Sequence, residues 1–215
     1  MIKISAYKWV PPFVQGLVRD LRPRWALEEL GLPYEVMLVA LGPEQSDPDY
    51  RALQPFGQVP ILEDGEIKLF ESGAIVLHLA SKSDVLLPRD TVERETAIAW
   101  IFAAINTMEV PITFGMRMTF ANVTSGPLYD GNMEWIGRRL GELAAALGDN
   151  DYLVGNRFSA ADLMMTTVLT QLRSTDLVAK HPTLVAYYAR CTARPAYQKA
   201  MADQLAVFRA NAPPA

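Results

Sequence analysis

Hydrophobic and polar positions in the first third of the chain change their spacing from one short segment to the next. Residues 2–7 and 34–41 have the alternating or β-branched character of strands, and residues 17–31 between them repeat apolar positions at helical spacing. Gly31 is a typical helix stop, and Pro23 requires the regular helix to begin shortly before it or to kink there. A helix that joins two strands predicts that the strands are parallel.

The next segments predict a short helix, a hairpin and another helix. Residues 47–55 begin with a capping aspartate followed by a proline. Residues 59–70 have the character of two strands joined at Asp64-Gly65, a tight-turn signal, and residues 71–80 predict a helix. Because a hairpin adds antiparallel strands, the first third of the chain predicts one mixed sheet.

After residue 82 the pattern becomes helical. Residues 82–89 are polar and contain a proline, which is typical of a linker. The segments with helical spacing are 90–118, 129–148, 159–173, 182–192 and 194–208. Strands confined to the first third predict an α+β fold with a sheet domain at 1–81, a linker at 82–89 and an all-helical domain at 90–215.

Composition narrows the class of protein. Half of the 215 residues are hydrophobic and the formal net charge is −4, so we expect a globular protein that binds no nucleic acid. The apolar stretches look too short or too interrupted to cross a bilayer, so we expect no membrane association. The single cysteine, Cys191, allows no internal disulfide, and the first residues lack the pattern of a secretion signal. We therefore expect a cytoplasmic protein.

The sequence contains no motif for a metal centre. His78 and His181 lie far apart, and neither belongs to a cluster with metal-ligand spacing. The chain also lacks a G-x-S-x-G motif and a phosphate-binding loop. His78 lies among apolar residues, where a structural role is the commoner one, and Cys191 is interpreted as a small core residue. We predict no metal.

The step Val59-Pro60 raises a question about the first strand of the hairpin. Proline has no N–H for a sheet ladder, so it normally stands at a strand edge or at the first residue of a strand. A proline at that place can also leave backbone groups available for another molecule to pair with. The local sequence leaves both interpretations open.

Four longer stretches, taken together, resemble the glutathione transferase superfamily, in the soluble form found in bacteria. They are "QPFGQVPILEDGEIKLFESGAIVLHLA" in the sheet domain, "RWALEELGLPYE", "FSAADLMM" and "LVAYYARCTARPAYQKA". The resemblance implies a thioredoxin-like mixed-sheet domain that binds glutathione as co-substrate. It also implies an all-helical domain that contributes the pocket for a small apolar electrophile.

The resemblance implies how glutathione would be held. The proline of the Val-Pro step, here Pro60, would be cis, and the N–H and C=O of Val59 would pair with the cysteinyl unit as an added strand. Glu71 would take the glutamyl ammonium. Ser72, which the pattern predicts as a helix N-cap, would take the glutamyl carboxylate at the positive end of the helix dipole.

Two amides and one phenol complete the expected site. Gln45 and Gln58 match family positions that reach the glycyl end or the backbone of glutathione. Relatives that activate the thiol with serine or cysteine place it at a position that here is Leu17, which has no polar side chain. Other relatives use a tyrosine at the end of the first strand, so Tyr7 is the leading candidate for the catalytic hydrogen-bond donor.

Other groups near the first helix remain alternatives for activating the thiol. Trp9 has an indole N–H, Arg19 carries a positive charge near the predicted helix start, and Gln15 has an amide. A backbone N–H at the helix start is a further alternative that needs no side chain.

Two features of the second domain have structural interpretations. Ser159 and Asp162 have the spacing of a capping box, which we expect to stabilise a buried helix. Residues 99–120 are rich in methionine and aromatic residues, of which most would be core and a subset would line an apolar cleft. Pro111 should kink this segment.

The sequence thus predicts a glutathione transferase in which the thiolate attacks a small apolar electrophile. The alternatives are a non-catalytic protein of the same fold that binds a partner or ligand, and a glutathione-dependent isomerase or dehalogenase. The resemblance also implies a homodimer.

Overall fold

The computed structural model describes residues 1–213, and these fall into two compact units. The first unit contains Met1–Leu87 together with residues 194–213, and the second contains Pro88–Ala193. Each unit is described separately below.

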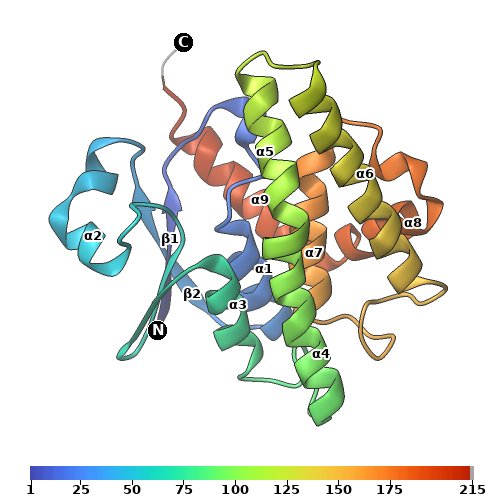
Figure 1. Ribbon diagram of the computed structural model, residues 1–215. Helices are drawn as coiled ribbons and strands as arrows, with labels where there is room; N and C mark the ends of the chain where they lie inside the picture. The colour runs from blue at the N-terminus through green and yellow to red at the C-terminus, as the bar shows by residue number, and fades with distance from the viewer. Residues whose placement is uncertain (214–215) are drawn as a thin grey trace. The chain divides into compact units, whose positions relative to one another are not determined.

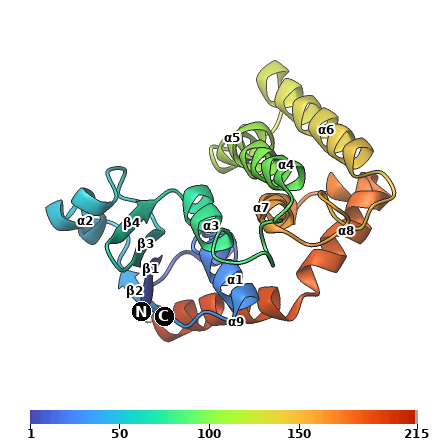
Figure 2. The same cartoon turned by 90° about the horizontal axis from the view of Figure 1, so that it is seen from below.

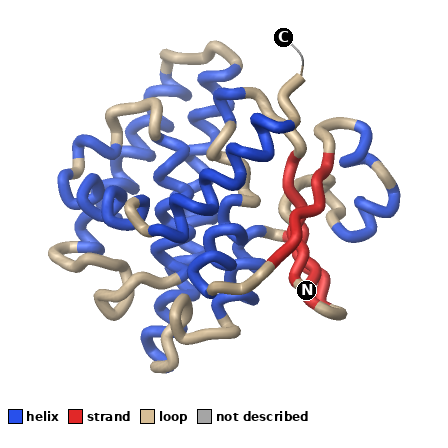
Figure 3. The backbone as a smooth tube through the Cα atoms, turned by 180° about the vertical axis from the view of Figure 1, so that it is seen from behind, coloured by secondary structure: helices blue, strands red, loops and turns tan. Residues whose placement is uncertain are grey.

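The first unit is built on a four-stranded mixed sheet, drawn in red in Figure 3. Its strands are β1 (Ile2–Tyr7), β2 (Tyr34–Val39), β3 (Ile61–Asp64) and β4 (Ile67–Phe70), in the order β2-β1-β3-β4. Strand β1 is parallel to β2 and antiparallel to β3, and β3 and β4 form the hairpin. The mixed sheet and the hairpin turn at Asp64-Gly65 are therefore confirmed.

Helices cover both faces of this sheet. Helices α1 (Leu21–Leu30) and α3 (Ser72–Ala80) lie on one side, and the short α2 (Pro48–Leu53) lies on the other (Figure 1, Figure 2). The core of this unit contains Ile4, Trp25, Leu27, Ile61 and Ile75, all at most 1% exposed. The predicted capping of α2 is confirmed, because the Asp47 carboxylate accepts from the N–H groups of Asp49 and Tyr50.

The first long helix begins later than expected. Regular α-helix starts at Leu21, whereas the apolar spacing predicted a start at residue 17. The preceding residues form turns, in which the Leu17 N–H bonds to the Val14 carbonyl and the Leu21 N–H to the Val18 carbonyl. Pro23 consequently lies in the first turn, where its missing N–H costs no helical hydrogen bond.

The last helix, α9 (Pro195–Ala210), packs against α1 within the first unit. The Gln204 amide donates to the buried Asp20 carboxylate at 2.6 Å, and the Arg194 guanidinium donates to both oxygens of Glu29 at 2.6 and 2.7 Å. This arrangement differs from the domain boundaries expected from the sequence, which grouped residues 194–215 with the other helices. Local spacing identifies a helix but carries no information about which distant helix it contacts.

The second unit is helical. Its α-helices are α4 (Thr91–Phe102), α5 (Glu109–Phe120), α6 (Pro127–Leu147), α7 (Ala160–Leu169) and α8 (Pro182–Thr192). The two units also contain short 3-10 helices at Pro12–Val14, Pro43–Ser46, Thr170–Leu172 and Val178–Lys180. All ten residues of α7 are buried, and α7 packs against α4 and α8, so it is the core helix of the unit.

A π-helical segment, Ala103–Met108, joins α4 to α5. Proline removes an N–H from the helix and crowds the turn before it, so Pro111 explains the irregular turn that precedes it. The sequence predicted a kink at this proline. The helical segment Thr91–Phe120 contains an 18-residue window with a mean hydropathy of 1.4, so it passes a membrane-span test by length and composition. The sequence predicted apolar stretches that are too short or too interrupted to cross a bilayer, and this segment does not fit that prediction. The core helices of soluble domains pass the same test, so the segment gives weak support for a span.

Candidate functional site

The loop that enters β3 is fixed by a small polar cluster. The Val59-Pro60 peptide bond is cis, as the resemblance implied. The Ile61 N–H donates to the Ser5 hydroxyl at 2.8 Å, and the Tyr50 hydroxyl donates to the Gln58 carbonyl at 2.6 Å. Ser5 and Tyr50 are themselves 3.1 Å apart. The ladder with β4 starts at Ile61, so Val59 lies just outside the sheet.

Gly57 allows this loop to approach the chain near Gln45. Its φ is +63°, and a Cβ at this position would lie 2.7 Å from the Gln45 carbonyl oxygen and 2.8 Å from the Arg51 guanidinium carbon. A larger residue would therefore be strained and would also clash with backbone. The loop geometry consequently depends on glycine at this position.

Tyr7 stands at the end of β1 with its hydroxyl beside this loop. The oxygen accepts a hydrogen bond from the Gln45 amide at 2.7 Å and a further one from the Val59 backbone. Burial is the main reason why the pKa of Tyr7 is raised above 10.0, and the nearby Tyr50 adds to the effect. The phenol therefore stays protonated at neutral pH. Among residues 1–213 no acceptor takes the Tyr7 proton, so the hydroxyl can donate to a bound group.

The side chains of Gln45 and Gln58 differ in the hydrogen bonds that they make. The Gln45 amide nitrogen also donates to the Gly57 carbonyl at 2.7 Å, and its oxygen accepts from the Gly42 N–H at 2.8 Å. Gln45 thus ties Tyr7 to the loop. The Gln58 side chain is exposed, and its carbonyl is held by Tyr50.

The start of α3 is open. Glu71 is the N-cap residue, with φ 70° and ψ 113°, and its side chain makes no capping hydrogen bond in the described chain. Ser72 is the first helical residue, so the prediction that Ser72 is the N-cap is wrong. A positive φ is unfavourable for a residue with a Cβ and is often found where a backbone is held for binding.

Arg22 reaches the start of α3 from α1. Its Nη1 donates to the Ser72 hydroxyl at 3.0 Å, and the two residues are 2% and 4% exposed. The sequence interpretation missed Arg22 because 50 residues separate it from Ser72. No local motif marks such a pairing.

The expected site residues lie at one end of the hairpin. Ile61 pairs with Phe70 in the antiparallel register, so Val59-Pro60 precedes β3 at the end where Glu71-Ser72 follows β4. The Tyr7 hydroxyl contacts both the Gln45 amide and the Val59 backbone. The structure therefore brings together an extended-backbone edge, a neutral phenol and an open helix start.

The alternative groups near the first helix are placed differently. The Arg19 charge acts on Tyr7 and lowers its pKa, but less strongly than burial raises it. The Gln15 amide donates to the Val10 carbonyl at 3.0 Å within the loop, and Trp9 is half-buried. At the start of α1 the Asp20 side chain makes no cap, because it pairs with Arg24 at 2.7 Å and with α9.

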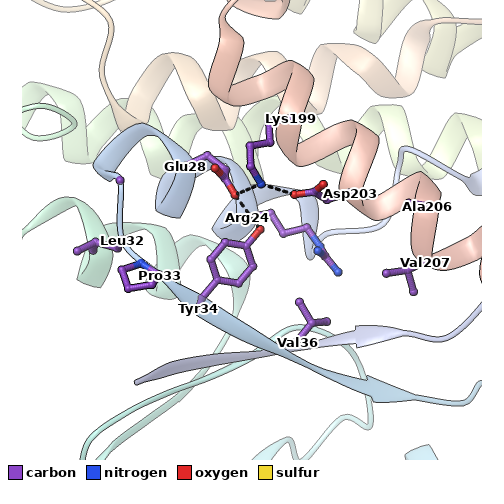
Figure 4. A pocket seen from close by; sticks show the side chains of 11 residues that line it. Arg24, Glu28, Leu32, Pro33, Tyr34, Val36, Lys199, Asp203, Ala206 and Val207 are labelled. Atoms are coloured by element: carbon purple, nitrogen blue, oxygen red, sulfur yellow. Dashed lines mark hydrogen bonds and ion pairs between the residues drawn. The ribbon is translucent and has the colours of Figure 1, made fainter.

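A separate cavity of about 600 Å³ lies within the first unit, between α1, β2 and α9 (Figure 4). Lys199 bridges Glu28 at 2.9 Å and Asp203 at 2.6 Å, and Tyr34 donates to Glu28 at 3.2 Å. These two hydrogen-bonded carboxylates raise the pKa of Lys199. The charges on this wall are already paired within the protein, so the cluster connects α9 to α1 and offers little to a charged ligand.

Within residues 1–213 no three His, Cys, Asp or Glu side chains are grouped to hold a metal. The second unit contains a smaller apolar cavity of about 270 Å³ beside α8, lined in part by Leu172, Val178 and Tyr188.

Two family models match the chain. The glutathione S-transferase N-terminal domain matches residues 14–81, and the glutathione S-transferase C-terminal domain matches residues 103–195. Among curated proteins, glutathione S-transferase 4 of Zea mays is 32% identical over 210 residues, with 91% of each chain covered. Tetrachloro-p-hydroquinone reductive dehalogenase of Sphingobium chlorophenolicum is 27% identical over 224 residues, covering 84% of this chain and 90% of its own.

Solved structures agree. Glutathione transferase F7 of Populus trichocarpa superposes with a TM-score of 0.78 at 26% identity, covering 95% of this chain and 99% of its own. A glutathione transferase of Burkholderia graminis, solved with two glutathione molecules per subunit, has a TM-score of 0.78 at 25% identity and covers 93% and 87%. Relatives of this chain thus come from plants as well as bacteria.

Proposed function

Because the chain belongs to the glutathione S-transferase family and is a glutathione transferase, we propose that the hairpin end of its first unit binds and activates glutathione. The observation that carries this proposal is the contact of the Tyr7 hydroxyl with the Val59 backbone beside the open start of α3. An extended backbone edge, a proton donor and an anion-attracting helix start are the three features that a γ-glutamyl thiol peptide requires.

In the proposed complex, glutathione adds to the backbone edge at Val59-Pro60 as a short strand. In the free protein the Val59 N–H donates a hydrogen bond to the Tyr7 hydroxyl. In the complex this N–H instead donates to the cysteinyl carbonyl of glutathione. The α-carboxylate of its glutamyl residue lies at Ser72, and the ammonium lies at Glu71. Gln58 is exposed and available to the glycyl end, whereas Gln45 acts by holding Tyr7 and Gly57.

The Tyr7 hydroxyl then donates a hydrogen bond to the glutathione sulfur and keeps its proton. A donor that stays protonated stabilises the thiolate over the thiol, and the raised pKa of Tyr7 keeps it a donor at neutral pH. The thiol proton leaves to solvent. The thiolate electron pair forms a carbon–sulfur bond to the electrophile, and the electrophile's leaving group departs with the pair of the broken bond.

The test is the ultraviolet absorbance of bound glutathione thiolate as a function of pH. In Tyr7→Phe we expect the thiol pKa to rise toward its free value and turnover of a generic aryl halide to fall about 10²–10⁴-fold. At a pH below the thiol pKa, affinity for glutathione should be unchanged or higher, because no thiolate hydrogen bond is lost and the Val59 N–H loses a competing acceptor.

Tyr34→Phe is the matched control, since Tyr34 lies on the same sheet, has a pKa raised mainly by burial and contacts Glu28 instead of the loop. An unchanged thiolate titration in Tyr7→Phe would remove Tyr7 from the mechanism and leave Arg19 or the loop backbone to explain activity. No binding of glutathione by the wild type under reducing conditions would overturn the proposed site itself.

The remaining parts of the proposal concern setting and assembly. The electrophile is small and apolar, no metal takes part, and the protein works in the cytoplasm without nucleic acid or membrane partners. We propose a homodimer. It is supported by the exposed aromatic pair Phe56 and Phe70, whose ring centroids lie 6.1 Å apart in an edge-to-face arrangement. Sedimentation as a 23.8 kDa species at micromolar concentration would contradict the dimer.

The relationship to a reductive dehalogenase makes glutathione-dependent dehalogenation a second candidate. In this chain the only cysteine, Cys191, is fully buried in α8. Glutathione itself would therefore have to supply every thiol of such a reaction. Formation of glutathione disulfide together with halide would identify this reaction, whereas a thioether product would identify transfer.

A further inference from the structure

We propose that the cavity between α1, β2 and α9 is a second binding site, which takes a small uncharged molecule with an apolar body and one carbonyl group. None of the described residues that line this cavity belongs to the proposed glutathione site. The observation that carries the proposal is a buried hydrogen-bond donor, the guanidinium of Arg24, which the described chain leaves incompletely paired.

The Arg24 side chain forms part of the cavity wall and is 2% exposed. Figure 4 shows it extending from α1 toward Val36 of β2. Its Nε donates to the buried Asp20 carboxylate at 2.7 Å, whereas its Nη2 has no hydrogen-bond partner among residues 1–213. A buried N–H without a partner costs free energy, because its bond to water is lost and no other replaces it. An acceptor that enters the cavity would remove this cost.

The rest of the cavity surface is mainly apolar. It includes the side chains of Leu32, Pro33, Val36, Ala206 and Val207. All five are half-buried or exposed, so apolar area is left for a ligand to cover. The volume of about 600 Å³ also lies within the range of about 300–1,000 Å³ that is typical of small-molecule sites. An apolar wall with a single open donor suits an apolar molecule that carries one acceptor.

The charges around the cavity disfavour an ionised ligand. Lys199 is held between Glu28 at 2.9 Å and Asp203 at 2.6 Å, so two carboxylates surround one cation. The charge of Arg24 is offset by Asp20. A carboxylate ligand would therefore meet an excess of negative charge, and an ammonium ligand could not accept from Arg24. A neutral carbonyl oxygen can accept from Nη2 without either disadvantage.

Tyr34 shows that the guanidinium acts on groups within the cavity as well as on Asp20. The Tyr34 side chain lines the cavity, and its hydroxyl donates to Glu28 at 3.2 Å. Burial raises the pKa of Tyr34, and the charge and hydrogen bonding of Arg24 oppose this rise. Because the Tyr34 proton is directed to Glu28, this phenol does not compete with Arg24 as a donor to the ligand.

The experiment measures the binding of three matched probes to the full chain by nuclear magnetic resonance titration. Acetophenone has a carbonyl group, α-methylstyrene has a CH₂ group in place of the carbonyl oxygen, and benzoate has a charged oxygen in place of the methyl group. We expect acetophenone to bind saturably with a Kd of about 1 mM or lower. The other two probes should bind at least about tenfold more weakly.

Variants then place the binding in this cavity. Val207→Trp should fill the cavity and weaken acetophenone binding about tenfold or more. Val185→Trp is the matched control, because it makes the same substitution at the smaller cavity of the second unit and should leave the affinity within about twofold. Arg24→Lys keeps a positive charge beside Asp20 but removes the guanidinium donor, so it should abolish the preference for acetophenone over α-methylstyrene. Lys199→Gln, which removes a charge that is already paired, should retain that preference.

Equal binding of acetophenone and α-methylstyrene by the wild type, or unchanged affinity in Val207→Trp, would overturn the inference. A preference that survives in Arg24→Lys, or an absence of saturable binding, would do the same and leave Arg24 with a structural role. An affinity that falls as the protein concentration rises would show that a second copy of the chain covers the cavity, which also contradicts the inference.

If Arg24→Lys fails to fold, the comparison of probes in the wild type and the Val207→Trp variant decide the question. Turnover with glutathione should be unchanged in Val207→Trp, because Val207 lies outside the proposed glutathione site. Failure of the second site would therefore leave the proposed function untouched, and failure of glutathione binding would leave the second site untouched.

Discussion

The starts of α3 and α7 both contain a serine and a nearby acidic residue, but only α7 is capped by these side chains. At α7 the Ser159 N–H and hydroxyl both donate to Asp162, at 2.9 and 3.0 Å, and the capping box is confirmed. At α3 the acidic residue precedes the serine, the acidic side chain caps nothing in the described chain, and the serine hydroxyl is held by Arg22. One helix start is closed by its own side chains, and the other is left for an acceptor from outside.

This comparison shows that the order of an acidic residue and a serine decides the use of a helix start. An aspartate three residues after the serine can turn back and satisfy the first N–H groups, which stabilises the fold. Glu71, immediately before the serine, makes no such hydrogen bond with its side chain within the described residues, and its backbone has a positive φ. Donors left open in this way are suited to binding.

The largest effect should come from breaking the closed start. The Asp162 carboxylate also accepts from the Leu153 N–H at 2.9 Å and from the Tyr187 hydroxyl at 3.0 Å, and the residue is fully buried. Asp162→Ala should leave these donors unsatisfied and lower the free energy of unfolding by about 3–5 kcal/mol, measured by urea denaturation. A loss below about 1 kcal/mol would show that the closed start contributes little.

The second-largest effect should be a loss of glutathione affinity when the open start of α3 is changed. Ser72→Ala should weaken glutathione binding by about 1.5–3 kcal/mol, because it removes a hydrogen bond to a carboxylate, and should cost about 1 kcal/mol of stability through Arg22. Ser159→Ala is the matched variant and should lower stability by about 1 kcal/mol without changing glutathione affinity. Calorimetry that gives equal affinities for the wild type and Ser72→Ala would remove the distinction between the two starts.

The smallest effect should be a difference in pH dependence between two carboxylates. Burial raises the pKa of Asp162 above its ordinary value of 3.8, so the carboxyl binds a proton more tightly in the folded protein than in the unfolded chain. Its contribution to stability should therefore be present at low pH and decline as pH rises from about 3.8 through the folded pKa.

Asp64 should show the opposite slope. Lys82, at 2.6 Å, and His78, at 2.9 Å, lower the pKa of Asp64, so its contribution is present above about pH 3.8 and is lost as pH falls through the lowered pKa. Because this pair is partly exposed, Asp64→Asn should cost less than about 1 kcal/mol at pH 7. Denaturation of Asp64→Asn and Asp162→Asn from pH 3 to pH 7 should give slopes of opposite sign relative to the wild type, and equal slopes would contradict both assignments.

Features set by neighbours in the sequence could be predicted, and features set by distant partners could not. The hairpin with its Asp64-Gly65 turn and the Ser159 capping box follow from residues within a few positions of each other. The prediction of Ser72 as an N-cap was wrong because Glu71 adopts a positive φ, and Arg22 takes the serine from 50 residues away.

The environment of Tyr7 illustrates the same limit. Strand spacing placed Tyr7 at the end of β1, and the resemblance suggested a donor there. Its contact with Gln45, 38 residues along the chain, depends on how a loop returns across the strand end. Tertiary packing decides such a contact, and a single sequence carries little information about it.

The position of α9 affects the order in which the protein folds during synthesis. Asp20 receives its hydrogen bond from Gln204, a residue translated 184 positions later. Until the end of the chain emerges, α1 lacks the helix that buries its outer face, and the Asp20 carboxylate lacks one of its partners. The sheet unit, although translated first, is therefore completed last, and during synthesis its exposed surface is a natural place for a chaperone to act.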